Sequence, residues 1–363
     1  MTPTLDDLRR YAVARTLFAP TTLARAIEQL GFVQADPIRA PARAQDLILR
    51  HRVRNYRAGD LERRYARLPV EEDFFVNYGF MPRTVQRLMH PRTFRTQLSA
   101  SHRKRAQAIL DHMRDRRPLH PRKIEALFAH GKVTNAWGGS SNATTHLLDA
   151  MHYRGMLRVA RRVSGTRLYA AQSYLPGAER DAGLDMLIDV LALTYSPLPL
   201  RTLHVLARRL ALSAPQWRDG ITGALRRAKE RLGHARVGDT DWFWSAGEDP
   251  RSHGDLRADA VRLLTPFDPI VWDRERFELL WGWMYRFEAY TPPAKRKLGY
   301  YALPLLWHDR IVGWSNVRVE SEKLVSDFGY VAGKAPKDAA FRQALDEELE
   351  RMRQFLSLPL RRG

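Results

Sequence analysis

Cysteine is absent from this sequence, and its absence removes several classes of chemistry. Without thiols the chain has no disulfide, no thiolate zinc site, no iron–sulfur cluster and no cysteine nucleophile. No stretch approaches the roughly 18 uninterrupted apolar residues that a membrane span needs. Charged residues also interrupt the first 30 positions, so a signal-peptide core is missing. We therefore expect a soluble intracellular protein with no membrane partner.

Motifs that would identify a cofactor are missing as well. The sequence contains neither a phosphate-binding P-loop nor the H-E-x-x-H pattern of zinc hydrolases. Its 12 histidines do not follow the spacing of metal ligands. We therefore expect no cofactor and no metal site. Lysine is scarce, with nine among the 60 basic residues, and none lies near Gln34.

Positive charge is the dominant excess. Lysine and arginine number 60 against 40 acidic residues, which gives a formal net charge of +20. High-GC codon usage explains the preference for arginine over lysine, but it does not explain the surplus of bases over acids. Such a surplus favours a polyanionic partner, above all nucleic acid. A membrane surface and anionic small molecules are the alternatives.

The N-terminal part is predicted to be helical. The chain is long enough for two or three domains, and its 44% hydrophobic content is typical of a folded protein. Apolar periodicity predicts two helices within residues 4–30, the second opened by Thr21-Thr22 and ended by Gly31. Residues 40–115 are predicted as further arginine-rich helices with a mixed turn at 76–79. These elements form the first unit, residues 1–117.

Two later segments share one order of elements, namely helix, helix and β-hairpin. This is the order of a winged helix. The first segment is residues 118–180, where hairpin strands at 157–163 and 166–170 meet at Ser164-Gly165. In this segment a helix from Pro121 is predicted to stop at Gly131. The second segment is residues 181–255.

The C-terminal part differs in character. Short β-runs, such as 310–314 and 317–319, indicate a β-rich domain over residues 256–363, and a final helix is predicted at about 336–356. The predicted fold class is therefore α+β, with tandem winged-helix units followed by a β-rich domain. Residues 4–60 could be a more divergent winged helix of the same type.

The tripeptide Gln34-Ala35-Asp36 is the clearest candidate for catalysis. At a bend or at the start of a helix, its amide and its carboxylate can converge on one water molecule. Held in this way, the water could attack a bond that is already prone to break. A Schiff-base mechanism that cuts the strand has no lysine nucleophile nearby. The pattern alone is common, but the arginines that follow it indicate that the bond belongs to a nucleic acid.

Three groups of basic residues are predicted to contact DNA. The first follows the tripeptide, and its spacing also fits a partly solvated helix face. The second lies on a predicted hairpin, where arginines would meet phosphates or enter the minor groove, although a charged edge strand that resists aggregation is the alternative. The third is a loop tip. The residues are Arg39, Arg43 and Arg50; Arg161, Arg162 and Arg167; and Lys295, Arg296 and Lys297.

Several sequence blocks together make the chain resemble the winged-helix DNA glycosylase family that includes the bacterial interstrand-crosslink unhooking enzymes. The resemblance covers most of the chain, and the blocks are specific in combination. They are GFVQADPI at 31–38, Arg43-Ala44, Phe80-Met81-Pro82-Arg83, LTPFDPIVWDR at 264–274, Lys295-Arg296 and Gly299-Tyr300-Tyr301.

This resemblance implies three tandem winged helices in a C-shaped arrangement, with a β domain that closes a DNA channel. It implies that Asp36 is the base and negative stabiliser and that Gln34 orients the water, in the Gln-apolar-Asp form of the family's motif. It adds Arg83 to the expected DNA contacts. There is one departure. Crosslink-unhooking members typically carry a His-Glu pair where this sequence has Val76 and Asn77.

The expected chemistry suits such a site. Alkylation at N7 makes guanine cationic, so the base leaves as a neutral molecule without a strong general acid, and the enzyme must place water and stabilise an oxocarbenium-like sugar. The first hypothesis is a monofunctional, metal-free glycosylase for N7-alkylated purines, with interstrand crosslinks as a candidate further substrate. It would act as a monomer on damaged double-stranded DNA in the bacterial cytoplasm, associated with the nucleoid. The alternatives are a non-catalytic winged-helix DNA-binding regulator and an RNA-binding protein.

Overall fold

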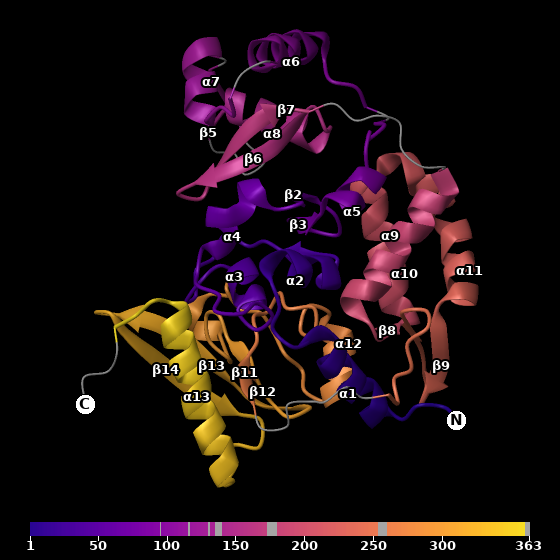
Figure 1. Cartoon of the computed structure of the whole chain (residues 1–363), viewed down its shortest axis with the longest axis vertical. Coiled ribbons are helices and arrows are strands. Elements are labelled where there is room, and N and C mark those ends of the chain that lie inside the picture. Colours follow the sequence, from indigo (N-terminus) through magenta and orange to yellow (C-terminus); the bar gives the residue numbers. More distant parts are fainter. Residues whose placement is uncertain are drawn as a thin grey trace.

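Helices and strands are mixed along the chain, which confirms the predicted α+β class (Figure 1). No helix in the described ranges is long and apolar enough to cross a membrane. The winged-helix assignment, the unit boundaries and the C-shaped arrangement stay predictions. The structure, a computed structural model, describes residues 1–94, 96–114, 117–129, 131–134, 140–172, 180–252 and 260–359.

The two predicted N-terminal helices are confirmed as α1 (Leu5–Thr16) and α2 (Leu23–Leu30). The side chain of Thr22 caps α2 by accepting a hydrogen bond from the Arg25 N–H at 3.4 Å. Gly31 ends the helix with a φ of 71°, a conformation that a residue without Cβ adopts at little cost. The chain then passes directly into the strand that carries Gln34.

A three-stranded antiparallel sheet is the main difference from the helical unit that the sequence predicts at the N-terminus. Its strand order is β1-β3-β2, and the predicted mixed turn is the β2–β3 turn with the start of β3. The sequence of β2, Val-Glu-Glu-Asp-Phe, resembles a solvated segment, but all three of its acids are buried. The elements here are β1 (Val33–Gln34), α3 (Ala44–Leu49), α4 (Asp60–Arg64), η1 (Tyr65–Arg67), β2 (Val70–Phe74), β3 (Tyr78–Pro82) and α5 (Arg83–Leu88).

The first predicted helix-helix-hairpin segment contains the two helices and the hairpin, but an unpredicted pair of short strands, Lys132–Thr134 with Ser140–Asn142, lies between the helices. One helix ends at Phe128, because Ala129 already has a φ of 41°, so the predicted stop at Gly131 is wrong by two residues. Ser164 and Gly165 have φ values of 49° and 83°, as a two-residue hairpin turn requires. The elements are α6 (Ala100–Met113), α7 (Pro121–Phe128), β4 (Lys132–Thr134), β5 (Ser140–Asn142), α8 (Ala143–Tyr153), β6 (Leu157–Val163) and β7 (Thr166–Ala171).

The second such segment also has two helices and a hairpin, and it begins with a further long helix that the sequence does not predict. That helix, α9, buries Leu187 and Leu191 against the helices that follow. The hairpin joins a short strand to make a sheet of order β8-β10-β9. The elements are α9 (Arg180–Tyr195), β8 (Leu198–Pro199), α10 (Leu200–Ser213), η2 (Pro215–Gly220), α11 (Ile221–Arg231), β9 (Gly233–Val237) and β10 (Thr240–Trp244).

The C-terminal part contains a four-stranded antiparallel sheet, β11-β12-β13-β14, as the predicted β-rich character requires. One continuous strand, β13, replaces the two short runs that the sequence predicts. The final helix is confirmed, whereas α12 was not predicted. The elements are β11 (Val261–Leu263), α12 (Arg274–Trp281), η3 (Pro293–Lys295), β12 (Leu303–Trp307), β13 (Arg310–Glu320), β14 (Lys323–Tyr330) and α13 (Ala339–Phe355).

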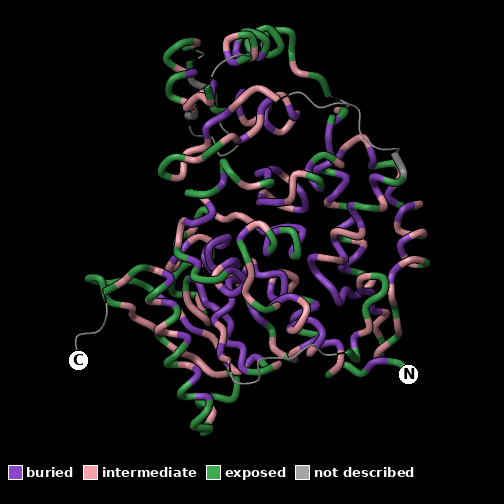
Figure 2. The backbone as a smooth tube through the Cα atoms, in the orientation of Figure 1, coloured by how far each residue is buried: buried purple, intermediate pink, exposed green. Residues whose placement is uncertain are grey.

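Buried residues gather in the middle of the molecule, around α2 and α3, where the N-terminal elements meet the C-terminal sheet (Figure 2). A fully buried ion pair joins these parts, because Arg52 donates two hydrogen bonds to the Asp268 carboxylate at 2.8 and 2.9 Å. A second buried pair, between Arg50 and Glu348, links the end of α3 to α13. Breaking such pairs is costly, so the Gln34-Ala35-Asp36 segment next to α3 has a rigid base.

Candidate active site

The Gln34-Ala35-Asp36 segment forms one edge of the N-terminal sheet. Gln34 is paired with Gly79 on β3, and the Ala35 N–H donates to the carbonyl oxygen of Tyr78 at 2.9 Å. The chain therefore stays extended beyond the end of β1. Residues two apart in an extended chain lie on the same face. This pairing extends as far as Ala35, and at Asp36 the side chain closes a local turn onto the Ile38 N–H, so convergence of Gln34 and Asp36 on one water stays a prediction.

Gly79 makes this pairing possible. A Cβ atom at this position would lie 2.3 Å from the Val33 carbonyl oxygen and 2.6 Å from the Phe32 ring. Neither group can move away, because both residues are buried in the core. The close approach of β1 and β3 therefore requires glycine here.

A chain of hydrogen bonds fixes the orientation of the Gln34 amide. Arg209, on α10, donates from Nη1 to Asn77 Oδ1 at 3.2 Å, and Asn77 Nδ2 donates to Gln34 Oε1 at 3.1 Å. A guanidinium group can only donate, so Asn77 must turn its oxygen to Arg209 and its NH2 group to Gln34. Gln34 must then present its oxygen to Asn77. Its own NH2 group is left to donate elsewhere.

Aromatic stacking and a second contact hold Arg209 in place. Its guanidinium group lies over the ring of Trp272 at 5.3 Å from the centroid, and Nη1 also approaches the Val76 carbonyl oxygen at 3.5 Å. Trp272 belongs to the block at 264–274, so α10 and the C-terminal part both support the Gln34 amide.

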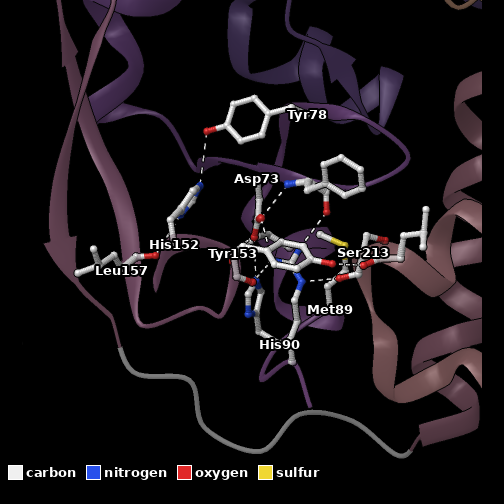
Figure 3. A network of polar contacts seen from close by, with 12 residues as sticks. Asp73, Tyr78, Met89, His90, His152, Tyr153, Leu157 and Ser213 are labelled. Carbon is white, nitrogen blue, oxygen red and sulfur yellow. Dashed lines mark hydrogen bonds and ion pairs between the residues drawn. The ribbon is translucent and has the colours of Figure 1, made fainter. Parts of the chain in front are cut away.

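The β2–β3 hairpin that carries Asn77 is anchored by a buried carboxylate (Figure 3). Asp73 accepts hydrogen bonds from His90 Nε2 at 2.7 Å, Gln86 Nε2 at 3.1 Å and Arg92 Nη1 at 3.0 Å. Burial acts to raise its pKa, but Arg92 and His90 outweigh burial and lower the pKa of Asp73 well below its usual range. The hairpin is therefore held firmly where it faces β1.

The Asp36 carboxylate is partly buried. Its Oδ1 accepts a hydrogen bond from the Ile38 N–H at 2.9 Å, and the Asp36 N–H donates to Gln45 Oε1 at 3.4 Å. Burial raises the pKa of Asp36, and the Ile38 hydrogen bond offsets this effect only in part. The ionised carboxylate is therefore poorly stabilised in the free protein.

An aromatic wall from the C-terminal part lies close to Asp36. Burial is the main cause that raises the pKa of Tyr301, and the charge of Asp36 raises it further. The Tyr301 hydroxyl contacts Thr265 Oγ1 at 3.1 Å, and its ring contacts Phe287 at 5.4 Å between centroids. The Asp36 carboxylate is therefore near enough to Tyr301, in the C-terminal part, for its charge to act on that side chain.

A cavity of about 580 Å³ begins next to the motif. Neither Gln34 nor Asp36 lines it, but Gln45, which contacts the Asp36 backbone, does. Its walls carry the basic residues Arg39 and Arg43. The cavity is large enough for a ligand group, since ligand pockets have volumes of roughly 300–1,000 Å³.

Comparison with known proteins decides the family. The family model described as DNA glycosylase AlkZ-like matches residues 27–355, which is nearly the whole chain. This chain belongs to the AlkZ-like DNA glycosylase family. Among solved structures, DNA glycosylase AlkZ of Streptomyces sahachiroi has a similar fold, with a TM-score of 0.65 over 99% of this chain and 98% of that chain. The sequence identity is 14%, at which the likeness shows the fold alone.

Membership of the AlkZ-like family confirms the predicted resemblance and supports a glycosylase that acts on DNA. The roles predicted for Gln34 and Asp36 stay predictions. Among the residues that the structure describes, no group of three His, Asp or Glu side chains is arranged to hold a metal ion.

Several of the arginines predicted to contact DNA form ion pairs within this AlkZ-like fold instead. The Arg50 side chain is 3% exposed and binds Glu348, so it is a structural residue and is no longer a candidate for DNA contact. Arg162 is 13% exposed and donates from Nε to Glu72 at 2.7 Å, which removes it from the interface for the same reason. Both carboxylates are fully buried and need their cations.

Two further predicted contacts are partly engaged. Arg43 binds Glu62 at 3.1 Å and lies against Gly165, and Arg167 binds Asp149 at 3.1 Å. Both side chains keep some exposure, so a DNA role for them stays a prediction.

The remaining predicted DNA contacts are accessible. Arg39, Arg161, Lys295 and Lys297 are exposed. Arg83 is 42% exposed although it contacts Glu71 at 2.9 Å. Arg296 donates to the Thr291 carbonyl oxygen at 2.8 Å and stacks over Tyr300. Their contact with DNA stays a prediction.

Sequence reasoning missed the residues that orient the motif. Asn77 stood out only as a departure from the family pattern, and Arg209 lies 132 positions further along the chain on an ordinary amphipathic helix. Gln45 lies on a buried helix and gave no signal. The one signal that was available is the block at 264–274, which contains Trp272.

Proposed function

We propose that this protein is a monofunctional DNA glycosylase that hydrolyses the N-glycosidic bond of N7-alkylated purines, and that crosslinks formed through purine N7 are a further substrate. Membership of the AlkZ-like family supports a glycosylase reaction on DNA. The observation that carries the lesion class is the partly buried Asp36 carboxylate, whose pKa is raised by burial.

The raised pKa of Asp36 means that its negative charge is poorly compensated before DNA binds. An N7-alkylated purine carries a positive charge, and its sugar becomes oxocarbenium-like as the bond breaks. Either charge, brought next to Asp36, supplies the missing partner. The attraction is stronger at a poorly hydrated site than in water. An undamaged purine is neutral and offers no such gain.

Gln34 and Asp36 have complementary hydrogen-bonding roles in this reaction. The Gln34 NH2 group donates to the oxygen of the attacking water, and the Asp36 carboxylate accepts one of its protons. The water oxygen bonds to C1′ of the sugar, and the bond electrons leave with the cationic base, which departs neutral. Amides such as Gln34, Asn77 and Gln45 cannot act as general acids, which favours a substrate whose leaving group needs no proton.

Water, rather than an amine, is the nucleophile in this proposal. The first lysine in the sequence is Lys104, so no lysine lies in the segment that contains β1, β2 and β3. Without a Schiff base the DNA backbone is left intact after base release. This supports the monofunctional assignment.

The test is base release from a labelled duplex that contains a single N7-methylguanine. Free base should be released, and the strand should break only after alkali treatment of the abasic site. The Asp36→Asn variant should lose base release and keep its affinity for the duplex. A second duplex with a nitrogen-mustard crosslink tests unhooking, which a denaturing gel would detect as separated strands.

Each contrary result has a distinct meaning. Strand cleavage before alkali treatment would contradict the monofunctional mechanism. Sequence-specific duplex binding without base release would favour the non-catalytic DNA-binding regulator. Release from the N7-methylguanine duplex without unhooking would limit the substrates to monoadducts.

A further inference from the structure

A groove of about 700 Å³ lies between α10 and α11, and none of the residues of the candidate active site lines it. The two helices lie side by side and are in contact (Figure 1). The floor of the groove is apolar. It consists of Ala211, Ile221, Leu225 and Leu212, of which Leu212 is 53% exposed. An exposed leucine in a concave site favours a partner with apolar groups.

Basic side chains surround this floor. They are His204 and Arg208 on α10, Arg218 between the helices, and Arg226 and Lys229 on α11. Among the residues that the structure describes, no acidic side chain lines the groove. Within the described part of the chain, none of these cations forms an ion pair with a carboxylate. The pKa of His204 is lowered, first by burial and then by the charges of Lys229 and Arg208, as expected where cations lack counterions.

The other face of α11 shows that this surplus is local. There Arg227 binds Asp185 through Nε at 2.8 Å, and Arg231 binds Asp189 at 2.7 Å. Both acids belong to α9. Basic residues on one side of α11 are therefore neutralised by the protein itself, whereas those that face the groove are not. The high arginine content of the chain does not by itself produce this asymmetry.

We propose that the groove binds an acidic peptide segment of a partner protein, in which carboxylates flank apolar side chains. The carboxylates would meet the basic rim, and the apolar side chains would cover the floor, as in other helix-lined peptide grooves. A DNA backbone would satisfy the cations, but phosphates and sugars would leave Leu212 and its neighbours against water. Charge and apolarity together therefore favour a peptide over DNA.

Fluorescence anisotropy with the full-length protein tests this proposal. The probe is a short labelled peptide in which glutamates flank a leucine and a phenylalanine. Two comparison peptides replace either the apolar pair by serines or the glutamates by lysines. A labelled undamaged duplex is the fourth probe. The first peptide should bind at least about tenfold more tightly than either comparison peptide, because each of these lacks one of the two complementary features.

Variants locate the binding. Reversing two rim charges, Arg208→Glu with Lys229→Glu, should weaken binding of the first peptide by about tenfold or more. Leu212→Asp should weaken binding of this peptide by a similar factor, because it places a negative charge among the apolar residues of the floor. The control is the double variant Lys334→Glu with Lys337→Glu, which changes the net charge by the same amount. Both lysines are exposed and lie away from the groove. This control should bind like the wild type, and base release should be unchanged in all variants.

Three results would overturn the proposal. If the acidic peptide without apolar residues bound as tightly as the first peptide, binding would be non-specific charge attraction. Loss of duplex affinity in the rim variant, without binding of the first peptide, would assign the groove to DNA. Equal peptide binding by the rim variant and the wild type would place the peptide elsewhere. If the double rim variant fails to fold, Leu212→Asp alone decides, because this side chain is largely exposed.

Discussion

Replacing Asn77 by aspartate tests the orientation of the Gln34 amide with almost no change in shape. Aspartate keeps the oxygen that accepts from Arg209, but it replaces the NH2 group that donates to Gln34 with a second acceptor. Two acceptor oxygens would then face each other across 3.1 Å. Gln34 would rotate its amide by half a turn and donate to the new carboxylate. Its NH2 group would no longer be available to the attacking water.

The size of the effect follows from the loss of one oriented donor. A hydrogen bond to a charged group, or to a charge that develops in the transition state, contributes about 1.5–3 kcal/mol. The rate of base release should therefore fall roughly 10- to 150-fold. Asn77→Ala leaves the Gln34 amide unrestrained without turning it, and the loss should be only about 2- to 10-fold. The fold should survive in Asn77→Asp, since the new carboxylate pairs with Arg209.

Single-turnover base release at saturating enzyme measures this effect apart from DNA binding. Asn55→Asp is the matched control, because it adds the same charge at an exposed position with a φ of 52°, which aspartate tolerates. A residue that only fills space would show the opposite order, with the truncation to alanine more harmful than the isosteric change to aspartate. That order, or an Asn77→Asp rate within about twofold of the wild type, would refute the orientation argument.

Three other changes probe the site and its support. Because burial raises the pKa of Asp36, base release should decline on acidification at a higher pH than an ordinary aspartate would give. The Asp36→Asn variant should lose activity, while its thermal stability at neutral pH should be unchanged or increased. The reason is that the ionised carboxylate costs stability once the pH rises through its folded pKa. A pH–rate profile and thermal melts would show both. Gly79→Ala should destabilise the fold by about 2–3 kcal/mol in urea titrations and abolish base release, because its Cβ would lie 2.3 Å from a backbone oxygen. Arg162→Met should cost about 3–5 kcal/mol of stability by leaving the buried Glu72 unpaired, whereas Arg161→Met at an exposed position should stay within about 0.5 kcal/mol. An Arg162→Met protein of normal stability and weakened DNA binding would restore Arg162 to the interface.

Local signals in the sequence predicted the elements that local chemistry determines. The cap at Thr22, the stop at Gly31 and the turn at Ser164-Gly165 each depend on a few neighbouring residues. The sheet that carries the motif could not be predicted in this way. Its strand β2 contains three acids that look solvated until arginines distant in sequence are placed against them.

In the candidate site too, the sequence reveals a local pattern but not the residues that long-range packing brings to it. The pair Gln34 and Asp36 is visible as a short pattern, and a family resemblance identifies it. Its supporting residues are not visible, because Arg209 and Tyr301 reach the site only through the packing of α10 and the C-terminal sheet. The predicted DNA contacts failed at Arg50 and Arg162 for a related reason. A buried carboxylate far away in the sequence was the partner of each.

The three consecutive acids of β2 limit where the chain can accept an insertion or a deletion. Glu71 binds Arg83 and Arg158, Glu72 binds Arg162, and Asp73 binds Arg92. Neighbouring strand residues point to opposite faces, so a one-residue insertion or deletion within β2 would turn the acids on one side of the change to the other face and separate them from their cations. Indels before β2 leave this pattern intact, whereas an indel between α5 and Arg92 would displace the cation of Asp73. The length of β2, beside the strand that carries Gln34, is therefore fixed by charge pairing.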